Sequence, residues 1–432
     1  MLRITTRLHG LISLFSCAIL VSTTDAATIT ANSCSQSAVR AAVAQASDGD
    51  TVLVPGGDCA WRGGSNEPGV LVDKAITLAG AGIDETIISD STRSGSLEVL
   101  VIISSPNARV TGFTFQGMRR STAAEPGLVV SSGADNVRVD HCKFDASAHS
   151  QPGRGMTVSA HGVIDHCVFI DCKQGVSVFG GNGKGDESWT QPLTLGTANA
   201  LYIEDCEFLY SQKYDGAMDA YGGARYVFRY NTVSGTKVAH HGLDSGNWRS
   251  VFSHEIYKNT MHNASSTAVS TAIRSRGGTG VIFDNVITGN YHQGMRFIYY
   301  RSCCEISHNY CGSWGRCDGD NARDGNQDSS GYPCMDQPGR TTNQQLSPVY
   351  EWNNTLNGLN ADLALSDPWG CRSPSMADHI QVNRDYFNNT VRPDYTPYEY
   401  PHPLTRGETP ETAPAPSDPA PSAPTNLRVV GE

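Results

Sequence analysis

The chain has little positive charge, and this narrows the partners that it can bind. Its 432 residues include 32 lysines and arginines against 43 aspartates and glutamates, which gives a formal net charge of −11. A protein of this balance lacks the basic surface that bulk binding of nucleic acid or of an anionic membrane requires. We therefore expect no nucleic-acid partner, although a local basic cleft stays open.

The sequence also lacks a membrane span of sufficient length. The apolar run at the start of the chain, Leu11 to Val21, is too short to cross a bilayer. Arg3 and Arg7 precede this run and small residues follow it, which is typical of a secretory signal peptide over residues 1–26. Leu14–Cys17 resembles a lipoprotein box, but its second residue is bulky and apolar residues continue beyond it. We predict a secreted or periplasmic protein rather than a lipid-anchored one.

The cysteines lack the spacing of a zinc site. No CxxC motif pairs with a second one or with spaced histidines. Removing the signal leaves twelve of the thirteen cysteines, an even number, in an oxidising compartment, so disulfides are expected. Cys34 and Cys59 are predicted to pair. A second group, whose connectivity stays open, comprises Cys303, Cys304, Cys311, Cys317, Cys334 and Cys371.

A short pattern recurs eight times between Asn107 and Tyr310. Each unit has a β-branched or aromatic residue three positions before and two positions after a register mark. The marks are Phe113, Cys142, Cys167, Cys206, Asn231, Asn259, Asn285 and Asn309. Intervals of 24 to 39 residues indicate a solenoid of short strands, in which stacked asparagine amides can hydrogen-bond from rung to rung. The pattern predicts a β-helix.

The beginning of the mature chain fits a cap followed by strands. Ser35 can N-cap a helix that runs to Ala46, with its small apolar residues on one face. Gly49–Pro55 and Ala75–Gly82 then have the composition of strands. Over residues 28–310 this arrangement resembles the secreted pectate-lyase-like right-handed parallel β-helix proteins. The resemblance implies an all-β, single-stranded right-handed parallel β-helix with an N-terminal capping helix and a disulfide-rich C-terminal extension.

The remaining boundaries follow from changes in composition. We predict the β-helix over residues 27–310 and a Cys- and Asn-rich extension, packed along the coil, over residues 311–408. A Pro-rich linker follows over residues 409–424, and a short tail ends the chain at residues 425–432. We expect a monomer.

Charged residues recur on a second series of strands. Alternation predicts an inward column of Met156, Val176, Met218, Leu243, Ile273 and Met295. The next position then forms an outward column of Thr157, Ser177, Asp219, Asp244, Arg274 and Arg296. Arginine cannot relieve repulsion by losing its proton, so the column favours an anionic partner: either Asp244 itself or a bound carboxylate. The alternative is an Asp–Arg ladder that only holds the sheet together.

Further candidates flank this column. Tyr221 and Arg276 fall on a neighbouring outward column, and Lys213, Lys237, His240 and His241 stand just before strands. Histidine can exchange a proton near neutral pH, although it is often only a satisfied turn residue. An insertion within Gly180–Asn199 carries Trp189, which could stack on a sugar ring or belong to a rigid, self-packed flap. Trp248 and Arg249 extend the same edge.

Together with the column, the resemblance implies a secreted lyase that cleaves an acidic, uronic-acid-containing polysaccharide by β-elimination. Arg274, Arg276 and Arg296 would neutralise the uronate carboxylate, and His241 would remove the proton, with Lys213 or Lys237 in reserve. Tyr221 could assist the leaving group. Residues assigned to substrate binding are Arg276, Arg296, Trp189, Trp248, Arg249 and His240. Asp219 and Asp244 could hold Ca²⁺, a hard ion that prefers oxygen ligands; no other cofactor is expected.

Other functions stay open at this point. His241–Gly246 and Ile273–Arg276 are loosely similar to strands of polygalacturonases, which are glycoside hydrolases, and Asp219 with Asp244 could supply their carboxylate pair. That family's Asn-Thr-Asp strand is absent, and Arg276 stands where it has lysine. A non-catalytic carbohydrate-binding or adhesive β-helix is a third hypothesis. A uronan epimerase would share the base and the neutralising cations with a lyase.

Overall fold

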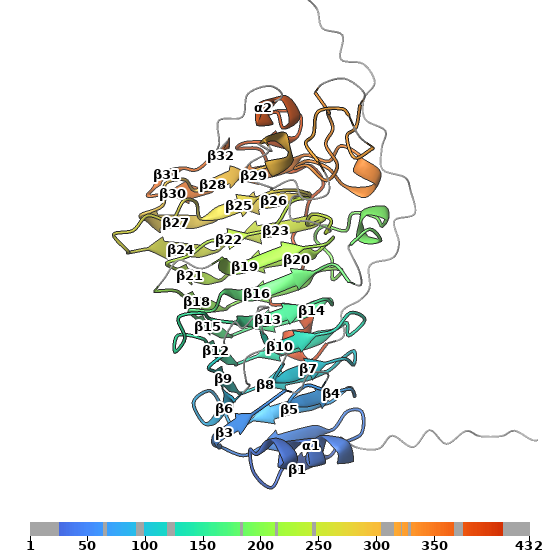
Figure 1. The fold of residues 1–432 in the computed structure, drawn as a ribbon, viewed down its shortest axis with the longest axis vertical. Helices are drawn as coiled ribbons and strands as arrows, with labels where there is room; N and C mark the ends of the chain where they lie inside the picture. The colour runs from blue at the N-terminus through green and yellow to red at the C-terminus, as the bar shows by residue number, and fades with distance from the viewer. Residues whose placement is uncertain are drawn as a thin grey trace, which may run out of the picture.

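The chain winds into a right-handed parallel β-helix, seen from the side in Figure 1. The computed structural model describes residues 26–63, 67–91, 99–118, 126–181, 185–211, 215–243, 248–303, 315–320, 322–326, 330–366 and 375–408. The predicted signal peptide, linker and tail therefore lie outside the described residues, apart from Ala26. Within the described part of the chain, no helix combines the length and apolar character needed to cross a membrane.

Each turn of the coil contributes one strand to each of three sheets, and the strands pair in parallel except for one hairpin at the end. Sheet 1 contains β1 (Thr28–Thr30), β2 (Thr51–Val54), β5 (Thr77–Gly80), β8 (Arg109–Thr111), β11 (Val137–Asp140), β14 (Gly162–Asp165), β17 (Leu201–Glu204), β20 (Arg225–Arg229), β23 (Ser253–Tyr257), β26 (Thr279–Phe283), β29 (Val349–Trp352) and β33 (Tyr386–Phe387). Sheet 2 contains β3 (Gly57–Trp61), β6 (Thr86–Asp90), β9 (Thr114–Gln116), β12 (Lys143–Asp145), β15 (Val168–Ile170), β18 (Glu207–Leu209), β21 (Thr232–Ser234), β24 (Thr260–Asn263), β27 (Val286–Gly289), β30 (Thr355–Leu356) and β31 (Leu359–Asn360). Sheet 3 contains β4 (Val70–Val72), β7 (Val101–Ile103), β10 (Pro126–Val130), β13 (Arg154–Val158), β16 (Gln174–Phe179), β19 (Gly216–Tyr221), β22 (Val238–Ala239), β25 (Ile273–Ser275), β28 (Met295–Phe297) and β32 (Leu363–Leu365).

The core is built from like residues stacked rung upon rung. Phe115, Phe144, Phe169 and Phe208 occupy the same register position in successive strands of sheet 2, and their ring centroids are 4.8 to 5.3 Å apart. All four side chains are fully buried. Because each rung buries its apolar face only against its neighbours, the stack forms one continuous core along the coil.

The predicted register marks form a buried column at the bend between sheets 1 and 2. The residue before each mark has a positive φ, for example 49° at His141 and 56° at Tyr230, which turns the chain sharply. Asn231, Asn259 and Asn285 hydrogen-bond to one another through their side chains, which confirms the predicted amide ladder. The ladder continues to Asn354 through a bond of 2.8 Å from the Asn285 amide. The predicted last mark, Asn309, lies outside the described residues.

Replacing Asn259 with alanine is expected to lower the free energy of unfolding by about 2–4 kcal/mol, because buried partners lose their hydrogen bonds. The Asn259 amide donates to Phe228 O and Asn285 Oδ1, and its Oδ1 accepts from the backbone and side chain of Asn231. The exposed neighbour Thr260 provides the control, since its replacement with alanine should cost less than about 0.5 kcal/mol. Urea unfolding compares the variants; equal midpoints would contradict a stabilising role for the ladder.

The cysteines among the register marks carry free thiols. Cys142, Cys167 and Cys206 are buried and unpaired, as is Cys172 in the following bend. Burial raises the pKa of the Cys172 thiol, so this group stays protonated at neutral pH. The expectation that the even set of cysteines forms disulfides is therefore wrong for these four, which pack as small apolar residues instead.

The N-terminal cap forms as predicted. Helix α1 (Gln36–Gln45) follows Ser35 and buries Val39, Ala42 and Val43 against the first rungs. The predicted disulfide joins Cys34 to Cys59, and the Trp61 indole donates to the Cys34 carbonyl beside it. The helix lies across the end of the coil, where Figure 1 shows it at the base. This covers strand edges that would otherwise be open to pairing.

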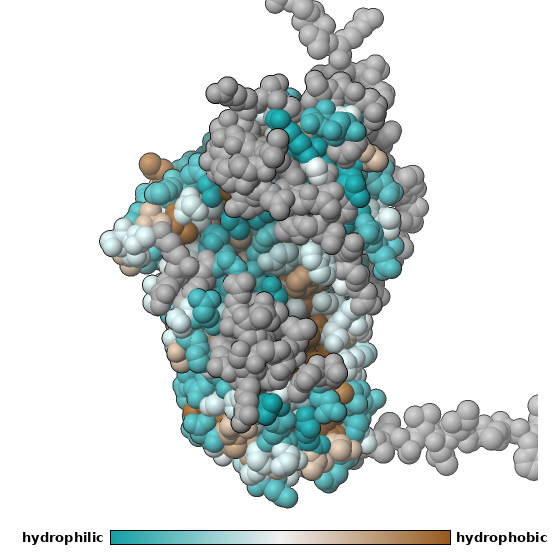
Figure 2. All heavy atoms as spheres, viewed as in Figure 1, coloured by the Kyte–Doolittle hydropathy of each residue, from teal (hydrophilic) through white to brown (hydrophobic). Residues whose placement is uncertain are grey.

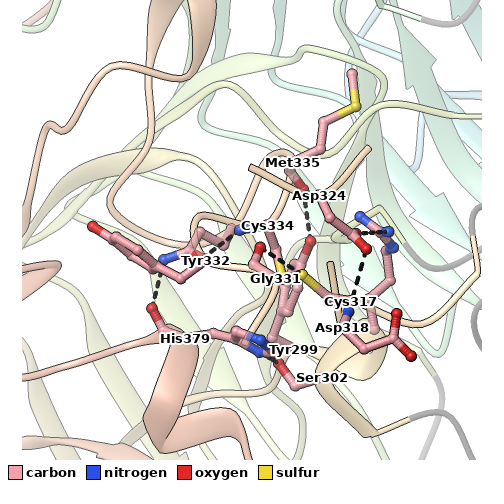
Figure 3. Close-up of a disulfide and its surroundings, with 12 residues drawn as sticks. Tyr299, Ser302, Cys317, Asp318, Asp324, Gly331, Tyr332, Cys334, Met335 and His379 are labelled. Atoms are coloured by element: carbon pink, nitrogen blue, oxygen red, sulfur yellow. Dashed lines mark hydrogen bonds and ion pairs between the residues drawn. A yellow bond between two sulfur atoms is a disulfide. The ribbon is translucent and has the colours of Figure 1, made fainter. Parts of the chain in front are cut away.

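The predicted end of the coil at residue 310 is too early. Strands β29, β30 and β32 add a further turn to the three sheets, and β33 extends sheet 1 beyond it. Part of the preceding segment is held by a disulfide between Cys317 and Cys334, beside which His379 Nδ1 lies 2.6 Å from the Ser302 hydroxyl (Figure 3). Residues 392–408 then run back along sheet 1 as a strap, where Arg229 donates to the carbonyls of Tyr398 and Glu399. These residues therefore contact the outer face of the coil.

Candidate functional site

The register of sheet 3 brings most of the predicted outward column together and corrects one member of it. Met218 pairs with Val238, so Ala239 occupies the position predicted for Asp244, between Asp219 and Arg274. Arg274 in turn pairs with Arg296. The prediction of Asp244 in the column is wrong, because the chain leaves sheet 3 soon after β22. Asp244 itself and Lys213 lie outside the described residues.

The corrected register places the predicted base beside the predicted carboxylate. His241 follows β22, and its Nδ1 lies 2.8 Å from Asp219 Oδ1. The His241 ring also stacks on Tyr221, with the two centroids 4.2 Å apart. Its Nε2 makes no hydrogen bond with any residue that the structure describes, and the side chain is 19% exposed. The ring is therefore oriented from one side and open to a substrate at the other nitrogen.

The charges around this pair keep Asp219 ionised and His241 neutral. Burial lowers the pKa of His241, with Arg276 and Arg274 acting in the same direction and Asp219 opposing them. Burial alone would raise the pKa of Asp219, but His241 and Arg274 bring that pKa below its usual value. At neutral pH the histidine thus donates through Nδ1 to a carboxylate and presents a lone pair at Nε2, as a general base requires.

A buried hydrogen-bond network fixes the second oxygen of Asp219. The Tyr221 hydroxyl donates to Asp219 Oδ2 at 2.7 Å, and the Gln174 amide donates to both of these oxygens, at 3.0 and 2.8 Å. Burial and the neighbouring carboxylate raise the pKa of Tyr221 well above its usual value, so the phenol keeps its proton. The side-chain oxygen of Gln174, Oε1, accepts hydrogen bonds from the Ser177 hydroxyl and from Arg154 Nε. Sequence reasoning missed Gln174, because a single glutamine at the start of a strand carries no recognisable signal.

Gln174→Ala is expected to lower kcat about tenfold while leaving the fold intact, since a positioning hydrogen bond is worth about 1.4 kcal/mol. The amide touches both Asp219 and Tyr221, so its loss frees both side chains to reorient. Gln174→Met serves as a matched variant because it keeps the length of the side chain and removes the donor without adding a charge beside Asp219. Rate measurements at saturating substrate test the role; wild-type kcat in both variants would reject it.

Uncompensated positive charge lies next to this network. The Arg274 side chain makes no hydrogen bond or ion pair with the residues that the structure describes, and its buried Nε has no partner among them. Among the described residues, the Arg296 guanidinium hydrogen-bonds to two serine hydroxyls, those of Ser270 and Ser366, at 3.2 Å each. The two guanidinium groups are neighbours across one strand spacing, which corresponds to a repulsion of about 3 kcal/mol at an effective dielectric near 20. Burial and Arg274 lower the pKa of Lys237 to about 8. The cluster favours an anion and excludes the Asp–Arg ladder for these two arginines.

Three predicted substrate contacts are instead parts of the scaffold. His240 points inward, fully buried, and lies 2.9 Å from the Tyr226 hydroxyl and 2.8 Å from that of Ser275. Trp189 is 1% exposed and packs on Phe252, so it cannot stack on a sugar. Arg249 is buried and forms a two-pronged ion pair with Asp336. These predictions are wrong because proximity in sequence said nothing about which way each side chain points.

Two other predicted contacts stay at the edge of the site. Trp248 is 39% exposed and tilts onto Phe179 with their centroids 5.3 Å apart, so its ring remains available for stacking. Arg276 is largely buried and lies over the Tyr300 ring at 4.2 Å. It is close enough to His241 to affect the pKa of that residue. On the face seen in Figure 1, the described residues that Figure 2 leaves uncovered are mainly hydrophilic, with a smaller apolar strip among them.

The calcium prediction does not fit the residues around Asp219. Both carboxylate oxygens accept hydrogen bonds, and His241, Arg274 and Lys237 surround the group with donors and positive charge. A divalent cation prefers several free oxygen ligands, which this position does not offer. Carboxylates do gather at Asp318, Asp320 and Asp324, far along the chain, where Asp324 is already paired with Arg301.

Comparison with known proteins finds distant structural similarities only. No family model and no curated protein matches the chain. A solved alginate lyase from Paenibacillus sp. str. FPU-7 is 15% identical, with 63% of this chain and 98% of that chain covered and a TM-score of 0.40. The A-module of mannuronan C-5 epimerase AlgE4 from Azotobacter vinelandii is 14% identical, with 77% and 94% covered and a TM-score of 0.44.

Proposed function

We propose that this protein is a secreted lyase that cleaves a uronic-acid-containing polysaccharide by β-elimination. The observation that carries the proposal is the pairing of a neutral, carboxylate-held His241 with the unpartnered cation Arg274 on one sheet face, among the residues that the structure describes. A base beside an uncompensated cation suits removal of a proton adjacent to a carboxylate, because the cation stabilises the negative charge that develops.

Each step has a residue to perform it. Arg274 and Arg296 bind the uronate carboxylate, which charge-assisted hydrogen bonds favour. His241 Nε2 takes the C5 proton, and Asp219 stabilises the imidazolium that results. The C4–C5 double bond forms as the C4–O bond breaks, and the imidazolium of His241 gives the proton to the departing oxygen. Tyr221 positions Asp219 instead, because its hydroxyl already donates its proton to Asp219 Oδ2 and its raised pKa keeps that proton in place.

Hydrolysis by paired carboxylates has less support. An inverting or retaining hydrolase needs a carboxylic acid that can donate a proton to the leaving oxygen. Asp219 is fully buried, its pKa is lowered, and both of its oxygens already accept hydrogen bonds. Ala239 stands where the second carboxylate was predicted. These features favour elimination over the polygalacturonase-type reaction.

A substrate panel tests the proposal. The protein is incubated with polymers of mannuronate, guluronate, galacturonate and glucuronate, and absorbance near about 235 nm reports the unsaturated product. We expect this absorbance with at least one polymer and its loss in the His241→Ala variant. New reducing ends without absorbance would establish hydrolysis instead. Deuterium uptake at C5 with neither product would establish epimerisation, and binding alone would favour an adhesive role.

A further inference from the structure

A cavity of about 550 Å³ lies beside the site, at the edge of sheet 3. Its walls come from the turns after β10 and β13 and from the described residues of the inserted flap within Gly180–Asn199. Among its lining residues are Ser132, Asp135, Ser159, Phe179, Ser188 and Arg225. We call it the flap pocket. Its volume falls in the range of small-ligand sites, and no step of the proposed reaction uses it.

An aromatic row connects the flap pocket to the reacting residues. Phe179 lines the pocket and stacks on Tyr221 with the centroids 5.1 Å apart, and Tyr221 stacks on His241. These three residues come from successive rungs, so the pocket floor lies about 10 Å from the base along the coil. A linear polymer lying across the rungs at His241 therefore reaches the pocket within a few sugar units.

The charges of the flap pocket differ from those around Arg274. Among the lining residues that the structure describes, Arg225 is the cation, and its guanidinium already donates to the carbonyls of Pro192 and Ser188 and to the Thr194 hydroxyl. Asp135 and the exposed Glu187 contribute two negative charges. Burial lowers the pKa of His161, so this residue adds no positive charge at neutral pH. The balance disfavours a second carboxylate and suits hydroxyl groups.

The wall of the pocket is held in place before any ligand binds. Thr342 donates to the Gln191 carbonyl from the C-terminal extension, and Arg249 links Asp186 of the flap to Asp336. Trp189 anchors the flap from below through a hydrogen bond to the Ser250 carbonyl. A preformed wall avoids the entropy cost of ordering a loop on binding.

We propose that the flap pocket binds an uncharged sugar unit of the polysaccharide, a few units away from the uronate held at Arg274. The Phe179 ring supplies an apolar floor for the sugar, and the serine hydroxyls and Asp135 bind its hydroxyl groups. This inference rests on the proposed function for the position of the polymer. It identifies the substrate as one in which uronate and uncharged sugars both occur.

Calorimetry on the His241→Ala variant measures binding without turnover of the ligand. Two tetrasaccharides are compared, one alternating hexuronate with N-acetylhexosamine and one made of uronate alone. We expect the mixed tetrasaccharide to bind at least about tenfold more tightly, equivalent to 1.4 kcal/mol. Adding Ser159→Trp, which fills the pocket, should remove that advantage, whereas Thr232→Trp on the exposed face of sheet 2 should preserve it.

A second variant tests the charge argument without changing the shape of the pocket. Glu187→Gln removes a negative charge from an exposed side chain and should improve binding of the all-uronate tetrasaccharide. Tighter binding of the all-uronate ligand to the unmodified pocket, or no effect of Ser159→Trp on either ligand, would overturn the inference. Because binding is measured without turnover, failure here is distinct from failure to detect elimination in the substrate panel.

Discussion

Replacing His241 with alanine is expected to reduce kcat by about a thousandfold, within the usual range for loss of a general base. The side chain is the one neutral base that the described residues place against a buried carboxylate in sheet 3, with Nε2 open to substrate. Binding should change little, because the proposed contacts to the substrate carboxylate come from Arg274 and Arg296. Single-turnover rates and calorimetry on the same preparation separate the two effects.

Asp219→Asn provides the matched variant for this prediction. The asparagine keeps the size of the side chain but removes the charge that orients and stabilises the protonated ring, so kcat should fall by about a hundredfold or more. Asp219 also raises the pKa of His241 against the effect of burial. Its loss should therefore move that pKa still lower.

The pH profile gives a signature that misfolding would not produce. Since the pKa of His241 lies below its ordinary value of 6.5, the base is unprotonated at neutral pH and the rate should fall only in more acidic solution. In Asp219→Asn the residual activity should persist to a lower pH than in the wild type. If the fall in rate at acidic pH occurs at the same pH in Asp219→Asn as in the wild type, or if His241→Ala keeps full activity, the proton is transferred by another group.

The architecture could be predicted because it repeats. The period of the marks, the asparagine ladder and the capping helix all depend on local patterns that recur or lie close in sequence. The end of the coil could not be predicted, because the register mark that follows Asn285 in the ladder is Asn354. An insertion of this length hides the next repeat from any search for a fixed period.

Irregular spacing also explains why one strand of the site was predicted at the wrong place. Both Val238 and Leu243 fit the pattern of the inward residue that should pair with Met218. Leu243 lies 25 residues after Met218, which is closer to the common period than the 20-residue interval from Met218 to Val238. The shorter interval is correct. The predicted register of Asp219 beside Ser177 and of Arg274 beside Arg296 is confirmed, because neither pair includes the strand that was placed wrongly. The burial of His240 and Trp189 depends on side-chain direction, which spacing alone does not determine.

Arg274→Met should lower kcat/KM by about a hundredfold to a thousandfold, because a charged donor aimed at a developing negative charge is lost. Methionine retains much of the apolar stem, so the sheet should stay packed. Stability should hold or rise slightly, since the substitution relieves repulsion between Arg274 and Arg296. Thermal unfolding of the variant is therefore part of the measurement.

The same substitution should also move the acid limb of the pH profile. Arg274 helps to keep the pKa of His241 low, so its removal should raise that pKa and make activity fall at a higher pH than in the wild type. This shift is opposite in sign to that expected for Asp219→Asn. Arg62→Met, at an exposed arginine near the N-terminal cap, controls for a general loss of positive charge. Unchanged kcat/KM in Arg274→Met would mean that the substrate carboxylate is bound elsewhere. A fall in activity that begins at a lower pH than in the wild type would show that Arg274 does not lower the pKa of the base.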